Sequence, residues 1–337
     1  MGFSPEPMHR DTPFFVFGCP RSGTSLLSRM LHWHPRLAVP YESHVLTQFT
    51  DLVPSYRRLG RREGIERLVG DILSTHDFRY WDPVPDRRAI TAEVEELDIV
   101  EILSSIVGVW ARQIGKERWG EKTPGHLFHW DRIQGRYPDA KIVHIVRDPR
   151  DVALSWIKVR FGVKTFYMAA SRWRLYLEEV SRVKELVGPR RLHEVKYEDL
   201  LENPESELRT ICEFLGESYS DRMLSFHENR AAYGTDAVNE SNLKKPLLTR
   251  NSGKWATELS PAAVELVESV TGDWLLRYGY EQTAALREIG KLEDWFRRNV
   301  ESPPARLWGM ARNRRGYAEA WGMAKIRSRL ILSGLFR

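Results

Sequence analysis

Residues 14–27 read FFVFGCPRSGTSLL, and this stretch decides the fold. Its first four apolar residues predict a buried strand, the polar run between Gly18 and Gly23 predicts a loop, and the apolar spacing that follows predicts a helix. Loop amides and the positive end of the helix dipole would converge on one point, where they hold an anionic group without a metal. The stretch therefore predicts an anion-binding cradle. The alternative is a tight turn that the glycines only ease.

The cradle resembles a P-loop, with one departure. Loops that bind nucleoside triphosphates read G-x-x-x-x-G-K-[ST], whereas here Gly18 and Gly23 keep the spacing and Thr24 stands in place of the lysine. The cation is Arg21, inside the loop, a position that suits one transferable anion on a shorter chain. The run PRSGTSLL is similar to the 5′-phosphosulfate loop of sulfotransferases, whose donor is 3′-phosphoadenosine 5′-phosphosulfate (PAPS). The resemblance implies that the donor contacts Pro20, Arg21, Ser22, Gly23, Thr24 and Ser25.

A second segment strengthens the resemblance. Residues 141–147, KIVHIVR, read as a buried strand, and a proline near the first helical position then opens a helix. Arg147 is thus expected at the carboxyl edge of a parallel sheet, where ligands bind, and Ser155 two helical turns further on. In sulfotransferases an arginine at a strand end and a serine eight residues later hold the donor's 3′-phosphate, which implies this role for Arg147 and Ser155. The alternative is an ion pair of Arg147 with Asp148 or Asp151.

Two further positions match the catalytic residues of the tyrosylprotein branch of this family. Glu42 falls where that branch has its catalytic base, and a glutamate within reach of an acceptor can take the proton that the acceptor loses. The alternative is a solvent-facing glutamate at a helix start. Lys122, in the run WGEKTP, resembles the lysine that approaches the transferred group, where it would offset developing charge. The alternative is a surface lysine.

Three positions later in the chain complete the implied donor site. Tyr197 matches a family tyrosine near the nucleotide, and Lys254, in the run SGKW, resembles the basic residue of a late loop that closes over the 3′-phosphate. Asn239 is a departure, because the tyrosylprotein branch has a serine there that assists the donor. Asparagine can still donate a hydrogen bond, so a contact with the reactants remains conceivable while the catalytic role is in doubt.

The composition fits a globular enzyme. The chain has 337 residues, 42% of them apolar, which is enough for a substantial core. Its two cysteines lie far apart in sequence, so no disulfide framework is implied, and Cys19 is expected to be a buried filler. The first residues contain no apolar signal core, and no eighteen-residue apolar run follows. We therefore expect a cytoplasmic protein.

The order of elements predicts an α/β fold, a P-loop-like three-layer arrangement with a central parallel sheet flanked by helices and carrying helical insertions. We expect helices over residues 61–73, 92–113, 167–186, 205–215 and 262–278. A sulfotransferase domain is expected over residues 1–285. It contains a helical insertion at about residues 44–117, our candidate for the part that binds the acceptor. Residues 286–337 are expected to form a helical, basic extension.

The end of the chain differs from the rest in charge. Residues 304–337 contain eight basic residues and one acidic residue, a net +7, although the whole chain is only +5. Apolar residues, including Trp308 and Trp321, are interleaved with these bases. Such a tail fits peripheral contact with an anionic membrane, such as the inner membrane face, or a homodimer contact, or a solvated extension. Nucleic-acid binding is not expected, because no recognition motif accompanies the charge.

The sequence also bounds the chemistry. The histidine pairs His32 with His34 and His126 with His129 lack further ligands at a recognisable spacing, so no metal is expected. The predicted function is transfer of a sulfuryl group from PAPS to a hydroxyl or amine acceptor, which could be a glycan, lipid, peptide or small alcohol. Two alternatives remain. A P-loop kinase would bind triphosphate with magnesium, and a non-catalytic nucleotide-binding or membrane-docking protein would not need Glu42 and Lys122.

Overall fold

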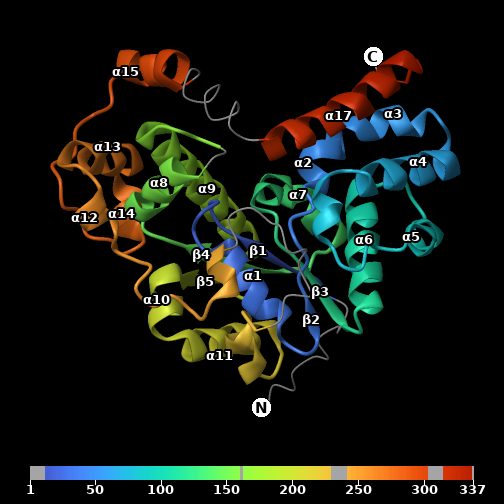
Figure 1. Cartoon of the computed structure of the whole chain (residues 1–337), viewed down its shortest axis with the longest axis horizontal. Coiled ribbons are helices and arrows are strands. Elements are labelled where there is room, and N and C mark those ends of the chain that lie inside the picture. The colour runs from blue at the N-terminus through green and yellow to red at the C-terminus, as the bar shows by residue number, and fades with distance from the viewer. Residues whose placement is uncertain (1–11, 160–161, 229–240, 303–313, 336–337) are drawn as a thin grey trace.

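The centre of the molecule is a five-stranded parallel sheet. The computed structural model describes residues 12–159, 162–228, 241–302 and 314–335. The strand order is β2-β3-β1-β4-β5, and every neighbouring pair is parallel. The strands are β1 (Phe14–Phe17), β2 (Leu37–Ala38), β3 (Arg118–Glu121), β4 (Lys141–Val146) and β5 (Leu192–Lys196). Parallel strands need long crossovers, and helices supply them on both sides of the sheet (Figure 1). The expected α/β class is confirmed.

Every connection between consecutive strands contains at least one helix. The helices are α1 (Thr24–His32), α2 (Val45–Phe49), α3 (Val53–Arg57), α4 (Arg61–Leu73), α5 (Arg87–Glu93), α6 (Ile99–Gln113), α7 (Trp130–Arg136), α8 (Pro149–Lys158), α9 (Phe166–Val187), α10 (Tyr197–Glu202), α11 (Pro204–Leu215), α12 (Trp255–Glu258), α13 (Pro261–Thr271), α14 (Asp273–Arg277), α15 (Lys291–Phe296) and α17 (Arg314–Leu332). A 3₁₀ segment, Pro124–His129, precedes α7, and a π-helical turn, Arg297–Glu301, continues α15.

Side chains on β1 alternate between two cores, which is why the fold has three layers. Phe15 and Phe17 belong to the larger core, which α6, α8, α9 and α13 help to build. Phe14 and Val16 belong to the second core, formed with α1, α10 and α11. Because both faces of the strand are buried, its sequence is continuously apolar rather than alternating.

Three of the five expected helices are confirmed, as α4, α9 and α11, and the other two are each divided. The expected helix over residues 92–113 is wrong at its start. Asp98 caps α6 by accepting hydrogen bonds from the amides of Val100 and Glu101, so a new helix begins there. The expected helix over residues 262–278 breaks at Gly272, whose φ of 54° ends α13 and separates it from α14.

The helices α2–α6 fill the stretch between β2 and β3, and the C-terminal helix α17 lies against them. Figure 1 shows α17 beside α3 and α4, and the Arg329 guanidinium pairs there with the Asp71 carboxylate of α4. The division into a domain ending near residue 285 and a separate extension stays a prediction. The carboxyl ends of the parallel strands share one edge of the sheet, and the segments that follow them meet there.

Candidate active site

The loop between β1 and α1 has the backbone of an anion cradle. Gly23, which precedes α1, has a φ of 96°, and a Cβ atom added to it would lie 2.4 Å from the Tyr197 ring. Arg21 has a φ of 81°, an uncommon conformation for a residue with a side chain. No side chain caps the first turn of α1, and the buried Ser22 hydroxyl has no partner among the described residues. The loop thus leaves polar groups available for a ligand.

Arg147 lies where β4 ends and faces this loop. Its guanidinium is 7% exposed and donates hydrogen bonds to the carbonyl oxygens of Asn251, at 2.8 Å, and of Arg21, at 3.3 Å. It also lies 4.4 Å from the centre of the Tyr197 ring. The expected alternative is present as well, since Arg147 and Asp151 approach within 3.5 Å. The Nε group of Arg147, however, has no partner in the described part of the chain, so one buried donor is unused.

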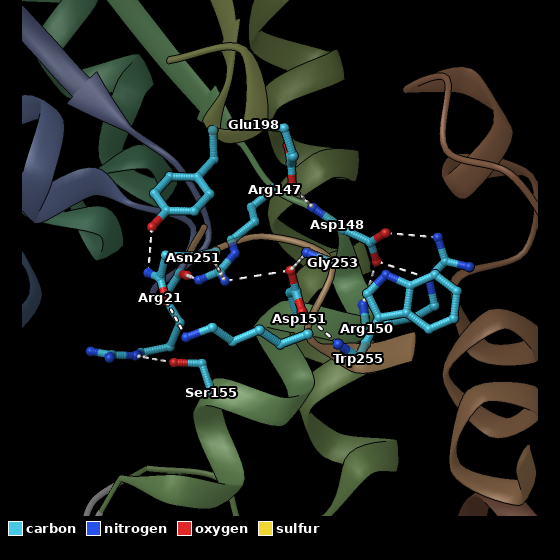
Figure 2. A network of polar contacts seen from close by, with 12 residues as sticks. Arg21, Arg147, Asp148, Arg150, Asp151, Ser155, Glu198, Asn251, Gly253 and Trp255 are labelled. Atoms are coloured by element: carbon cyan, nitrogen blue, oxygen red, sulfur yellow. Dashed lines mark hydrogen bonds and ion pairs between the residues drawn. The ribbon is translucent and has the colours of Figure 1, made fainter. Parts of the chain in front are cut away.

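Arg21 and Ser155 are direct neighbours. The Arg21 Nε group donates a 3.0 Å hydrogen bond to the Ser155 hydroxyl, which α8 presents to the loop (Figure 2). Burial lowers the pKa of Arg21, and the nearby charge of Arg147 lowers it further. Two guanidinium groups held together in this way favour an anion between or beside them. The structure thus brings Arg21, Arg147 and Ser155 into one cluster.

The late loop predicted to close over the donor lies on α8. The Asp151 carboxylate accepts hydrogen bonds from the amides of Gly253, at 2.7 Å, and Trp255, at 3.0 Å. The Trp255 ring lies 3.6 Å from the Arg150 guanidinium, and Arg150 in turn pairs with Asp148 at 2.7 Å. Figure 2 shows these contacts beside Arg147. The loop is therefore fixed at the site by the same helix that presents Ser155.

Lys254 and Tyr197 reach this cluster through Asn251. The Asn251 amide donates a 2.7 Å hydrogen bond to the Tyr197 hydroxyl and accepts one of the same length from the Lys254 ammonium. Lys254 itself is exposed, whereas Tyr197 is 5% exposed and packs on Gly23. The exposed ammonium is thus connected through Asn251 to the cluster around Arg147.

Glu42 and Lys122 form an ion pair at the other side of the loop. The Lys122 ammonium lies 2.6 Å from a Glu42 carboxylate oxygen and donates a 3.3 Å hydrogen bond to the Ser25 hydroxyl. The other carboxylate oxygen lies 3.3 Å from His44 Nε2. Burial alone would raise the pKa of Glu42, but Lys122 and then His44 together hold it well below its usual range. Lys122 is 2% exposed, so it is not a surface lysine, and Glu42 is not solvent-facing.

A buried hydrogen-bond network fixes the backbone on both sides of this pair. The Glu121 carboxylate accepts hydrogen bonds from the hydroxyls of Ser43 and Thr123, from the Thr123 amide and from His126 Nδ1. His126 Nε2 accepts a bond from the Leu46 amide, which identifies Nδ1 as the protonated nitrogen. Ser43 follows Glu42 in the chain, and Glu121 and Thr123 flank Lys122. The network therefore sets the position of Glu42 relative to Lys122.

A cavity of about 760 Å³ lies along α9 and α13. It is lined by residues of the 3₁₀ segment, α9, α13 and the chain around α15: Phe128, Val163, Tyr167, Met168, Ser171, Arg172, Arg174, Leu175, Tyr176, Glu178, Ser269, Val270, Arg287, Glu288, Ile289, Asp294 and Arg298. Burial raises the pKa of Tyr176, and Cys19 and the Glu42 carboxylate add to the rise. This wall of the cavity therefore lies within electrostatic reach of Glu42. Among the lining residues, none comes from the helical insertion.

Several residues of the cluster escaped the sequence reasoning. Asp151 is expected from the sequence only as an ion-pair partner of Arg147, and its bonds to the late loop are not; the only sequence signal of Asn251 is its position directly before the SGKW run. Glu121 stands directly before Lys122, and a buried carboxylate next to a buried lysine is itself a signal of a polar network. The position of Asn239 lies outside the described residues.

Other expectations concern metals, thiols and membrane spans. Within the described residues, no group of three histidine, cysteine or acidic side chains is placed to hold a metal. His32 is buried, and burial lowers its pKa to about 3, so it is a packed neutral side chain. Cys19 is buried as expected, and burial raises its pKa to about 12. No helix in the described ranges has both the length and the apolar composition to cross a bilayer.

Comparison with known proteins gives one family. The model of the sulfotransferase family matches residues 13–221, which include the cradle, Glu42, Lys122, Arg147 and Tyr197. Protein-tyrosine sulfotransferase A of Caenorhabditis elegans is 25% identical over 309 residues, covering 88% of this chain and 75% of the relative. The omega-hydroxy-beta-dihydromenaquinone-9 sulfotransferase of Mycobacterium bovis is 26% identical over 327 residues, covering 82% and 77%.

Two solved structures share the fold. The sulfotransferase domain of the curacin biosynthetic pathway aligns with a TM-score of 0.57 at 20% identity, covering 81% of this chain and 99% of the domain. The sulfotransferase domain of the Synechococcus PCC 7002 olefin synthase aligns with a TM-score of 0.54 at 24% identity, covering 79% and 98%. At these identities the likeness concerns the arrangement of sheet and helices.

Proposed function

Since the chain belongs to the sulfotransferase family, we propose that it transfers a sulfuryl group from PAPS to a hydroxyl or amine acceptor. The observation that carries the proposal is the cluster of Arg21, Arg147 and Ser155 around an uncapped helix start. Its guanidinium groups lie together, and its buried Ser22 hydroxyl and Arg147 Nε lack partners among the described residues. Such a cluster fits a ligand with two separate anionic groups.

The residues present fit the donor. The cradle from Pro20 to Ser25 would hold the sulfate-bearing 5′ end, because amides, the helix dipole and Arg21 converge there. Arg147, Ser155 and Lys254 would hold the 3′-phosphate, with Tyr197 as a wall. The bound donor supplies an activated sulfuryl group and a phosphate leaving group. Nothing in the donor set requires a metal, since Arg21 and Lys122 provide positive charge.

Glu42 and Lys122 have complementary roles in this proposal. Glu42 is ionised at neutral pH, so its carboxylate can accept the proton of the acceptor hydroxyl. As that proton leaves, the acceptor oxygen bonds to sulfur, and the bond between sulfur and the bridging oxygen breaks. Lys122, which touches both Glu42 and Ser25 of the cradle, is placed to meet the charge that develops on the departing oxygen.

We propose that the acceptor binds in the cavity beside Tyr176. The helical insertion, residues 44–117, contributes none of the described residues that line this cavity. The lining of the cavity combines aromatic and aliphatic side chains with arginines, which suits a largely apolar molecule that carries a polar group. One relative named above acts on protein tyrosine and another on a menaquinone, so the acceptor could be a peptide or a lipid-like alcohol. With any acceptor found by screening with radiolabelled PAPS, Met168→Trp should lower kcat/KM and leave donor affinity unchanged.

The two cysteines bear on the compartment in which the protein works. Both cysteines are free and buried, which fits a reducing environment. We therefore propose a cytoplasmic protein.

The first experiment is calorimetric binding of 3′-phosphoadenosine 5′-phosphate without magnesium. The wild-type chain should bind it, and Arg147→Ala should weaken binding at least thirtyfold, because a charge-assisted contact contributes about 2 kcal/mol. Arg61→Ala is the control, since Arg61 is exposed and pairs with Glu96 within the helical insertion. No binding, or equal preference for magnesium-ATP, would overturn the sulfotransferase proposal in favour of the kinase alternative.

A further inference from the structure

Large apolar side chains are exposed on the C-terminal part of the chain. On α15, Leu292 is 80% exposed, and Trp295 and Phe296 are more than half exposed. On α17, Trp321 is 65% and Leu332 is 88% exposed. Figure 1 shows both helices at the same edge of the molecule. Such a concentration marks an interaction surface rather than the scattered apolar residues that any surface carries.

The orientation of α17 is fixed by its inner side. Ile326 and Leu330 are buried against the helices of the insertion, and Arg329 pairs with Asp71 of α4. Because a helix has 3.6 residues per turn, the opposite side then carries Trp321, Lys325, Ser328 and Leu332, at spacings of four, three and four. The helix is thus packed on one side and presents to the outside a stripe in which Trp321 and Leu332 flank Lys325 and Ser328.

The charge around this stripe identifies its partner. The Lys325 ammonium lies 5.6 Å from the centre of the Trp321 ring, and the exposed Arg327 lies on a different side of the helix, two residues further on. The sequence from 304 to 337 has a net charge of +7 against −2 for everything before it. A second copy of the chain would bring a like-charged face, which opposes self-association. An anionic surface with an apolar interior matches both the bases and the exposed rings.

We propose that the outer side of α17 binds the surface of an anionic membrane, with Trp321 and Leu332 inserted at the interface and Lys325 at the headgroups. The helix lies on the bilayer and does not cross it. Helix α15, which lies at the same edge of the molecule in Figure 1, contributes Asp294 to the cavity beside Tyr176, and its Leu292 and Trp295 are exposed. Docking therefore brings the cavity near the lipid surface, which favours an acceptor drawn from the membrane.

The test is flotation of the full-length protein with lipid vesicles. Vesicles of phosphatidylcholine alone are compared with vesicles containing 30% phosphatidylglycerol, each at low and high salt. The wild type should float with the anionic vesicles at low salt and much less at high salt, because exposed charges are screened. Each basic residue near such a surface contributes about fivefold in affinity. Lys325→Glu should therefore lower partitioning by at least about fivefold, and Trp321→Glu/Leu332→Glu by at least about tenfold.

Matched controls lie at the opposite edge of the sheet. Leu186 is 51% exposed, Arg190 is exposed, and both precede β5, so they sit at the amino ends of the strands. Leu186→Glu and Arg190→Glu should float like the wild type. Equal flotation of the α17 variants and the controls would overturn the proposal, and so would failure of the wild type to bind anionic vesicles. Loss of a wild-type dimer in the α17 variants, without vesicle binding, would assign the surface to a second copy instead.

A separate measurement keeps this proposal apart from the enzymatic one. Binding of 3′-phosphoadenosine 5′-phosphate should be the same in the α17 variants and the wild type, which also shows that the variants fold. If the nucleotide fails to bind any variant while flotation behaves as expected, the sulfotransferase proposal fails and the membrane proposal stands.

Discussion

The ion pair of Glu42 and Lys122 allows a quantitative test by a double-mutant cycle. At 2.6 Å, Coulomb's law gives about 1.6 kcal/mol in water and about 6 kcal/mol at an effective dielectric constant of 20. Lys122 is 2% exposed and Glu42 is 22% exposed, so the pair lies between these limits. We expect a coupling of about 2–4 kcal/mol between Lys122→Met and Glu42→Gln at pH 7.

The pH dependence has a definite sign. In the wild type the folded-state pKa of Glu42 lies below its unfolded value of about 4.3, so the stabilisation is complete above that value and is lost as the pH falls toward the folded-state pKa. In Lys122→Met, burial is opposed by His44 and the Arg21 charge without the contribution of Lys122, and the pKa of Glu42 rises. The cost of Lys122→Met should therefore be largest at pH 7 and should shrink by at least about 1 kcal/mol at pH 3.

The assay is urea unfolding of the four proteins at pH 7 and pH 3. Other carboxylates that titrate in this range cancel in the cycle, because all four proteins share them. Arg61 and Glu96, which are both more than 60% exposed and 3.4 Å apart, form the control cycle with an expected coupling below about 1 kcal/mol. A Glu42–Lys122 coupling as small as that of the control, or one that grows at pH 3, would refute the reasoning.

Three further predictions concern the cradle, the network behind the ion pair and the thiols. Glu121→Ala leaves four donors without their acceptor and should cost about 3–5 kcal/mol of unfolding free energy in urea, with Glu121→Gln costing less; equal effects would contradict a role for its charge. Gly23→Ala should weaken nucleotide binding and destabilise the fold more than Gly60→Ala, whose φ is also positive but whose added Cβ meets nothing within 4 Å; equal costs would mean that backbone strain alone decides. The Cys19 thiol should react with a disulfide reagent at pH 8 at least a hundredfold more slowly in the native protein than in urea, and fast native labelling would show that it is accessible.

The juxtaposition of Arg21, Arg147 and Ser155 could be predicted from sequence because these residues lie in short local runs. The cradle and the β4–α8 segment each join a strand to a helix, so their place at the sheet edge follows from the strand alone. Arg147 and Ser155 share one such segment, and the contact of Ser155 with Arg21 needs only the pairing of β1 with β4.

The contact between Glu42 and Lys122 could not be predicted in the same way. Glu42 and Lys122 are separated by 80 residues, and their pairing depends on the crossover that places β3 between β1 and β2. The network around Glu121 likewise joins two distant segments, and no local pattern reports such contacts. The break before α6 was readable in principle, because Asp98 is a capping residue within an apolar run. The apolar residues on both sides of Asp98 nevertheless keep a helical spacing, and this spacing predicts one continuous helix over residues 92–113.

The attachment of the late loop to Asp151 has a consequence for turnover time. If the donor binds beneath residues 251–255 as proposed, the spent nucleotide would depart only after the amides of Gly253 and Trp255 separate from the Asp151 carboxylate. Asp151 belongs to α8, whose Ser155 contacts Arg21 of the cradle. Opening of the loop and weakening of the contacts with the ligand would therefore be coupled through this helix. The dwell time of the spent nucleotide, rather than the transfer step, would then set how often the enzyme completes a cycle.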